Sequence, residues 1–220
     1  MNYKRVVLLA GHYGSGKTNI AVNIALELRS RFDRVAIADL DIVNPYFRTK
    51  DSEAELKAAG ILLISSAFAG SNVDLPALPQ EAYSITDDRT LRAVMDIGGD
   101  DRGALALGRY TPFLRAEDDY EMLFVINKYR PLTRDPESAA QILHEVETAG
   151  GLPFTAIVNN SNLGEETAPE DVLASQAYAD AVTALTGLPV KMTTVKAPLV
   201  PALRGKIENL YPLTLQKKIK

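Results

Sequence analysis

Residues 6–18, VVLLAGHYGSGKT, join a run of five apolar residues to a glycine-rich segment that ends in lysine and threonine. The apolar run, residues 6–10, is continuous rather than alternating, which is typical of a strand buried on both faces of a sheet. Residues 11–18 satisfy the pattern G-x-x-x-x-G-K-[ST], in which main-chain N–H groups surround phosphate oxygens at the start of a helix. The stretch therefore predicts a strand, a phosphate-binding loop and a helix, in that order.

Every residue of this loop is a candidate for nucleotide binding: Gly11, His12, Tyr13, Gly14, Ser15, Gly16, Lys17 and Thr18. Lys17 is expected to neutralise the β- and γ-phosphates, which also makes it a candidate catalytic residue, and Thr18 to coordinate Mg²⁺ through its hydroxyl group. The alternative is a glycine-rich turn that only joins a strand to a helix. The apolar run before the motif and the helical pattern after it favour phosphate binding.

Short apolar runs recur along the chain with helical stretches between them. Seven runs are candidate strands: residues 5–10, 34–39, 61–65, 91–96, 122–127, 154–159 and 190–195. This alternation predicts an α/β fold of three layers, α/β/α, with a mostly parallel sheet of about seven strands, as in P-loop NTPases. A length of 220 residues is within the range of one domain, so we expect residues 1–220 to form a single nucleotide-binding domain.

Helix boundaries can be predicted where capping residues occur. One helix is expected over residues 17–32, and a second opens at Asp135 and Pro136 and closes at Gly150 and Gly151. A third helix is expected after Thr167 and Glu170, which have the spacing of a capping box, and it ends before Gly187.

The composition excludes several classes of protein. The chain has no cysteine, which excludes disulfides and any zinc or iron–sulfur centre that this chain alone holds through cysteine. A net charge of -4 gives no overall attraction to nucleic acid. No apolar run approaches the roughly 20 residues that a membrane helix needs. We expect a cytoplasmic protein with no nucleic-acid partner and no membrane span.

Aspartates follow two of the candidate strands. Asp39 and Asp41 are separated by one residue, so an extended chain places both carboxylates on the same side. Asp96 ends a later apolar run and is followed by Gly98 and Gly99. We expect Asp39 and Asp96 to hold Mg²⁺, and Asp39 and Asp41 to act in catalysis, Asp41 by orienting the attacking water. The alternative for each is a solvated strand end or a helix cap.

Arg48 lies in the irregular segment after the second candidate strand. It is a candidate for stabilising charge in the transition state or for contacting a partner subunit. A surface arginine without a function is an equally good interpretation.

The loop, residues 38–41 (ADLD) and residues 95–100 (MDIGGD) together resemble the MinD/ParA/CobQ-type ATPases, whose wider group includes the nitrogenase iron protein. The resemblance covers the first half of the chain well and the later strands only by their order. It implies ATP binding, slow hydrolysis and often a homodimer that encloses the nucleotides. Many members have a signature lysine where this chain has His12, which is shorter and often neutral. His12 is therefore either a functional substitute or a tolerated loop residue.

Two features of the sequence indicate which base the bound nucleotide has. Residues 127–130 read NKYR, whereas the guanine-binding motif N-K-x-D requires an aspartate where this chain has Arg130, so adenine is the better expectation. Asn159 resembles the asparagine that contacts adenine in the family, and an amide both donates and accepts there. The alternative is that Asn159 or Asn160 only caps a turn.

Three functions remain open. The first is a slow, magnesium-dependent ATPase whose nucleotide state switches contacts with an unidentified protein partner. The second is an ATP-dependent ligase or kinase of the dethiobiotin-synthetase or CobQ type. The third is a nucleotide-binding scaffold without turnover. The mixed apolar and basic tail, residues 210–220, resembles a membrane-targeting tail superficially, but Pro212 favours a docked or frayed segment.

Overall fold

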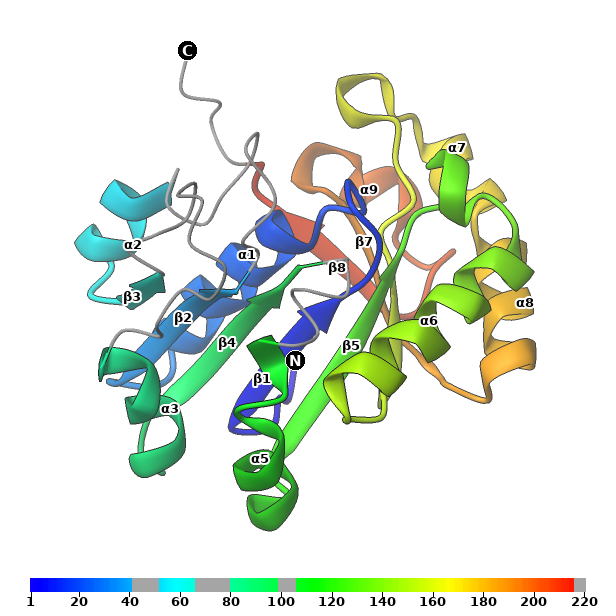
Figure 1. Cartoon of the computed structure of the whole chain (residues 1–220). Coiled ribbons are helices and arrows are strands. Elements are labelled where there is room, and N and C mark those ends of the chain that lie inside the picture. Colours follow the sequence, from blue (N-terminus) through cyan, green and yellow to red (C-terminus); the bar gives the residue numbers. More distant parts are fainter. Residues whose placement is uncertain (41–51, 66–79, 99–105, 216–220) are drawn as a thin grey trace, which may run out of the picture.

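Eight parallel strands form one sheet in the computed structural model, which describes residues 1–40, 52–65, 80–98 and 106–215 (Figure 1). The strands are β1 Val6–Ala10, β2 Val35–Leu40, β3 Leu62–Ser65, β4 Arg92–Ile97, β5 Tyr120–Ile126, β6 Ala156–Asn159, β7 Val190–Lys196 and β8 Leu210–Leu213. Their order in the sheet is β3-β2-β4-β1-β5-β6-β7-β8, and every pairing between neighbours is parallel. Because all strands run the same way, the loops after them gather at one edge.

Helices cover both faces of the sheet. One face packs against α3 Ser84–Asp87, α5 Thr111–Glu117, α6 Pro136–Gly150 and α8 Gln176–Thr186, and the other against α1 Lys17–Arg29 and α2 Glu53–Ala58. Two short helices, α7 Pro169–Ala174 and α9 Val200–Leu203, pack near β7 and β8. Single 3-10 turns occur at Gln80–Tyr83, Pro131–Thr133, Gly164–Glu166 and Ala197–Leu199. The predicted three-layer α/β/α fold is confirmed.

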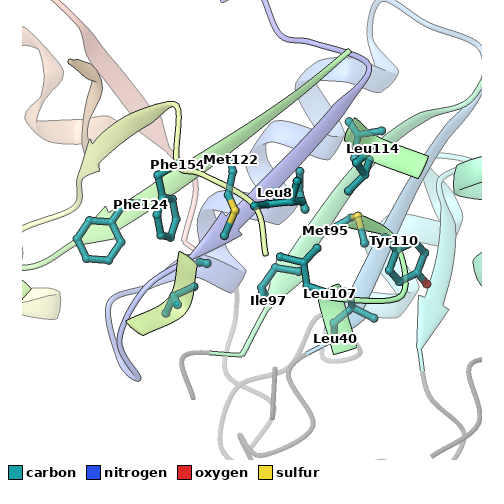
Figure 2. Packing of buried hydrophobic residues seen from close by; sticks show 14 of the residues in the cluster. Leu8, Leu40, Met95, Ile97, Leu107, Tyr110, Leu114, Met122, Phe124 and Phe154 are labelled. Carbon is teal, nitrogen blue, oxygen red and sulfur yellow. The ribbon is translucent and has the colours of Figure 1, made fainter. Parts of the chain in front are cut away.

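The core follows from the alternation of side chains along each strand. In β1, Val6, Leu8 and Ala10 face the α5 and α6 side, whereas Val7 and Leu9 face α1. Figure 2 shows the first side, where Leu8 lies between Met95 of β4 and Met122 of β5. Because both faces of β1 are buried, its apolar run has no polar alternation, as the sequence predicts.

The tail contains a strand that the sequence analysis did not predict. Residues 210–213 form β8, which pairs with β7 from Thr193 to Lys196 and docks at the end of the sheet. Pro212 is compatible with this position because an edge strand leaves one row of N–H groups unpaired. The expectation of about seven strands was therefore short by one.

The helix caps agree with the sequence in part. The side chain of Asp135 accepts a hydrogen bond from the Ser138 N–H at 2.8 Å, and Gly151 ends α6 in the left-handed conformation, as predicted. The predicted capping box at Thr167 and Glu170 is wrong, because the Asp171 carboxylate accepts from the Ala168 N–H instead, at 2.8 Å. Helix α7 then ends at Ser175, so the single helix expected there is two.

No helix in the part of the chain that the structure describes is long and apolar enough to cross a membrane.

Candidate nucleotide-binding site

The predicted phosphate loop lies between β1 and α1, at the edge where the parallel strands end. Gly11, Gly14 and Gly16 all have positive φ angles, of 145°, 75° and 93°. A Cβ atom on Gly11 would collide with the Val125 carbonyl oxygen, and one on Gly16 would collide with the Asn160 side chain. Glycine is thus needed at Gly11 and Gly16 for both conformation and space.

Helix α1 begins directly after the loop with Gly16 as its N-cap residue. Among the described residues, no side chain caps this end, and its first turn contains no acidic residue. The first N–H groups of a helix have no partner within the helix, and together they carry partial positive charge. This arrangement suits the oxygens of a phosphate group.

Lys17 and Thr18 form the first turn of α1 and are buried, with 5% and 7% of their surface exposed. The Lys17 ammonium donates to the His12 carbonyl oxygen at 3.4 Å, which keeps it over the loop. The His12 ring nitrogen Nδ1 lies 2.9 Å from the Tyr13 carbonyl oxygen, and Tyr13 is half exposed.

Asn160 connects the loop to the other half of the sheet. It follows β6 and is buried; its amide nitrogen donates to the Ser15 carbonyl oxygen at 2.5 Å. Its amide oxygen accepts from the Thr194 hydroxyl of β7, also at 2.5 Å. The loop is therefore held from β6 and β7 as well as by β1 and α1. From the sequence, Asn160 was expected only as a possible cap of a turn.

Asp39 and Asp96 occupy paired positions on neighbouring strands β2 and β4. Side chains alternate between the two faces of the sheet along each strand. Val35, Ile37 and Val94 lie on the face that packs against α1. Asp39 and Asp96 are an even number of positions further along β2 and β4, so they belong to the same face. Both carboxylates consequently belong to the face covered by the helix that starts with Lys17 and Thr18. They are buried, with exposures of 9% and 1%.

These residues fit a magnesium ion. Mg²⁺ takes oxygen ligands and usually combines one or two carboxylates with phosphate oxygens and water, so a hydroxyl and two carboxylates at one sheet edge are sufficient. Among the residues that the structure describes, no group of three or more His, Cys, Asp or Glu side chains is placed to hold a metal ion without such phosphate oxygens. Asp41 and Arg48, the other two candidates of the catalytic segment, lie outside the described residues.

Asn159 has a different position from the one that base contact requires. It is fully buried, its amide nitrogen donates to the Ser175 hydroxyl at 2.9 Å, and its amide oxygen accepts from the N–H and hydroxyl groups of Ser161. The bond to the Ser161 N–H, two residues ahead, is the turn-capping arrangement that the sequence left open. The expectation that Asn159 contacts adenine therefore does not agree with this geometry, because both ends of its amide are engaged internally.

The segment NKYR follows β5. Asn127 is fully buried and its amide oxygen accepts from the N–H groups of Tyr129 and Asn162, which ties this turn to the one after β6. Arg130 is exposed and extends to Gly14, where its guanidinium would lie 3.6 Å from a Cβ atom. A cation, rather than a carboxylate, thus lies beside the phosphate loop here.

A pocket of about 540 Å³ extends from the loop across the ends of β6, β7 and β8, a size typical of small-molecule sites. Its lining combines the loop and α1 start with polar turns and apolar side chains: Gly14, Gly16, Lys17, Thr18, Asn19, Arg130, Asn160, Ser161, Asn162, Gly164, Glu165, Thr167, Val172, Thr194, Val195, Lys196, Leu213 and Leu215. Lys196 and Glu165 form an ion pair of 2.9 Å at this pocket. The motif predicts the loop residues that line the pocket, whereas the sequence did not predict that Leu213 and Leu215 line it as well.

No protein-family model matches the chain, and no curated protein matches its sequence. The fold is similar to that of solved structures. FtsY from Mycoplasma mycoides matches with a TM-score of 0.58 and 18% identity, over 88% of this chain and 61% of that one. The cell division protein FtsY from Thermotoga maritima matches with a TM-score of 0.58 and 18% identity, over 86% and 61%.

The signal recognition particle 54 kDa protein from Aeropyrum pernix, solved in complex with GDP, matches with a TM-score of 0.52 and 18% identity. The match covers 87% of this chain and 41% of that one. The chain thus spans about three fifths of the FtsY chains and about two fifths of the 54 kDa protein. At these identities the similarity shows the fold alone, and this fold is that of an α/β P-loop NTPase.

Proposed function

We propose that the chain binds a nucleoside triphosphate with Mg²⁺ and hydrolyses it slowly, as a switch that controls contacts with a protein partner. The observation that carries the proposal is the loop itself. Two glycines whose Cβ atoms have no room, a helix start and a buried lysine meet at one point of the sheet edge. This combination matches the requirements of a phosphate-binding loop.

Each residue has a separate task in this proposal. Backbone N–H groups of residues 11–18 hold the phosphate oxygens, and the Lys17 ammonium neutralises charge on the β- and γ-phosphates. Thr18, Asp39 and Asp96 hold the metal ion, which supplies neutralisation of the charge that develops on the phosphates. Asp41 is the proposed residue for orienting the attacking water.

Adenine is the proposed base. A guanine-specific site needs a carboxylate that accepts from the N–H groups of the guanine edge, and Arg130 stands where the N-K-x-D motif has that carboxylate. GDP is bound by the Aeropyrum pernix protein, which makes GTP the proper comparison ligand. We retain the MinD/ParA/CobQ-type resemblance, a homodimer, an unidentified protein partner and a cytoplasmic location of this chain as parts of the same proposal, together with a single domain over residues 1–220.

Calorimetric titration with ATP and with GTP in the presence of Mg²⁺ tests the proposal. We expect binding of ATP, weaker binding of GTP, and a loss of about 100-fold or more in ATP affinity for Lys17→Ala, because a charge-assisted contact to the phosphates is removed. Lys206→Ala is the matched control, since Lys206 is exposed and does not line the pocket. Slow ADP release by the wild type and none by Lys17→Ala would support the proposed hydrolysis. No heat on addition of either ATP or GTP would refute the proposed nucleotide binding.

A further inference from the structure

The outer end of the pocket is built by the last described residues of the chain. Leu213 ends β8 and is buried, and Leu215, two residues later, is 41% exposed; both line the pocket. Val195 of the neighbouring strand β7 lines it too. The pocket therefore has a phosphate end formed by glycines and cations and a distal end with aliphatic side chains.

The segment that carries Leu215 is attached to helix α1 by a pair of hydrogen bonds. The amide nitrogen of Asn23 donates to the Thr214 carbonyl oxygen at 2.9 Å, and the Thr214 N–H donates to the Asn23 amide oxygen at 2.9 Å. Thr214 is the residue between the two leucines. One side chain thus fixes both main-chain groups of Thr214 and so the direction in which Leu215 extends.

Asn23 belongs to the helix that also begins at the phosphate loop. Asn19, one turn earlier, lines the pocket, and its carbonyl oxygen accepts from the Asn23 amide at 2.8 Å. Leu213 packs in the same cluster as Ile20 and Ile24 of α1. Helix α1 therefore connects the phosphate end of the pocket to its aliphatic end.

We infer that residues 213–215 form a wall for the nucleoside of the bound nucleotide, and that Asn23 is the positioning residue that holds this wall in place. The inference rests on the proposed function, because it assumes that the pocket holds a nucleotide. The faces of a purine are apolar, and covering a partly exposed leucine removes apolar surface from water. Such a contact does not depend on the groups at the edge of the base, so it acts on adenine and guanine alike.

The test separates the nucleoside from the phosphates. Calorimetry with Mg²⁺ gives the affinity of ATP, of GTP and of inorganic tripolyphosphate for the wild type, Leu215→Ala and Asn23→Ala. We expect both variants to bind each nucleotide about tenfold more weakly and tripolyphosphate within about twofold of the wild type, since the aliphatic contact involves only the nucleoside. Leu185→Ala is the matched control, because Leu185 is 51% exposed on α8 and does not line the pocket.

Three outcomes overturn the inference. Unchanged nucleotide affinity in Leu215→Ala means that this side chain makes no contact, and an equal loss for tripolyphosphate means that the variant disturbs the phosphate loop instead. A wild type that binds tripolyphosphate as tightly as ATP and GTP has no contribution from a nucleoside wall, although its phosphate site stands. A wild type that binds none of the three refutes the proposed function as well. Thermal melting checks that Asn23→Ala is folded, and Leu215→Ala tests the wall independently of it.

Discussion

Buried cations lie near both ends of strand β1, and their surroundings differ. Arg5, before the strand, is 3% exposed and donates to the Glu117 carboxylate and to the carbonyl oxygens of Ile85 and Leu91, the latter two at 3.0 Å. Lys17, after the strand and its loop, begins helix α1, whose first N–H groups carry partial positive charge, and its ammonium donates to the His12 carbonyl oxygen at 3.4 Å. Arg5 is paired with a carboxylate of the fold, and the glycine loop and helix start beside Lys17 form a surface that suits the anion of a ligand.

The different surroundings of Arg5 and Lys17 predict a role in stability for the first and a role in ligand binding for the second. A charge that the fold neutralises contributes to the native state whether or not a ligand is present, and its loss destabilises the chain. A charge placed beside a loop of glycines and helix N–H groups gains a further interaction when phosphate binds. Substitution of Arg5 is therefore expected to change mainly the free energy of unfolding, whereas substitution in the phosphate loop is expected to change mainly the affinity for nucleotide.

The largest effect is expected at the structural end. Arg5→Met removes the positive partner of the partly buried Glu117 and leaves buried carbonyl oxygens without donors, so the free energy of unfolding should fall by about 3 kcal/mol. Urea denaturation measures this change, with Arg89→Met, at an exposed position, as the control. A folded Arg5→Met variant that has lost its affinity for nucleotide would contradict the purely stabilising role of Arg5.

A smaller effect is expected from Gly16→Ala at the binding end. The added methyl group meets the Asn160 amide, and Asn160 has no room to give way without losing its bond to the Ser15 carbonyl oxygen. We expect a loss of about 2 kcal/mol in nucleotide binding, or about 30-fold in affinity.

Gly187→Ala is the control that has backbone strain from a positive φ but no collision of the added methyl group with a neighbouring atom. Gly187 has a similar positive φ of 73° but no atom within 4 Å of its Cβ position, and it lies at the end of α8. It should lose about 1 kcal/mol of stability and no affinity. Equal affinity losses in the two glycine variants would show that the loss follows from general destabilisation and not from the contact between residue 16 and Asn160.

The next effect concerns the metal. Asp96→Asn removes one of two neighbouring carboxylates, so the increase in nucleotide affinity that Mg²⁺ produces should shrink by about tenfold, or about 1.4 kcal/mol. Titration with and without Mg²⁺ measures it. Asp180→Asn, at an exposed position of α8, should behave as the wild type; a full magnesium effect in Asp96→Asn would contradict the metal assignment.

The smallest effect is expected at Glu27, on the far part of α1. Partial burial raises the pKa of Glu27, but hydrogen bonds from the Met1 amino group and Tyr211 outweigh it and leave the pKa below its ordinary value. A carboxyl group whose pKa is lowered by folding stabilises the protein at pH values above its unfolded pKa, about 4.3, and this contribution disappears as the pH falls through the lowered value.

Glu27→Gln should therefore be less stable than the wild type at pH 7, by at most about 1 kcal/mol because the site is partly solvated. The difference between the two proteins should disappear in acid. Thermal melting between pH 7 and about pH 3 measures both quantities. A difference that grows as the pH falls would have the wrong sign for this mechanism.

The fold was largely predictable because its signals are local. Continuous apolar runs and the cap at Asp135 depend on neighbouring residues, and both agree with the structure. Strand β8 was missed because four residues that include Pro212 have no local strand pattern, and pairing with β7 is what makes them a strand. The break between α7 and α8 was missed for a similar reason, since Ser175 bonds to Asn159, which is distant in sequence.

The site was predictable only at its phosphate end. The motif at residues 11–18 identifies the loop because glycines and a lysine at fixed spacing have one common use. The roles of Asn159 and Asn160 depend on which of two adjacent amides faces the interior, and the sequence alone does not distinguish them. Asn23 and Thr214, the residue before Leu215, are far apart in the sequence, so the hydrogen bonds between them are visible only in three dimensions.

The position of β1 in the sheet has a consequence for the order of assembly during synthesis. β1 precedes both of its neighbours, β4 and β5, in the chain, and its first partner residue in β4 is Ala93. A parallel strand has no hairpin partner next to it in the chain, so contacts of this kind form slowly. The nascent phosphate loop therefore remains without its supporting strands until β4 and then β5, residues 92–126, have emerged, so nucleotide can assist folding only after that point.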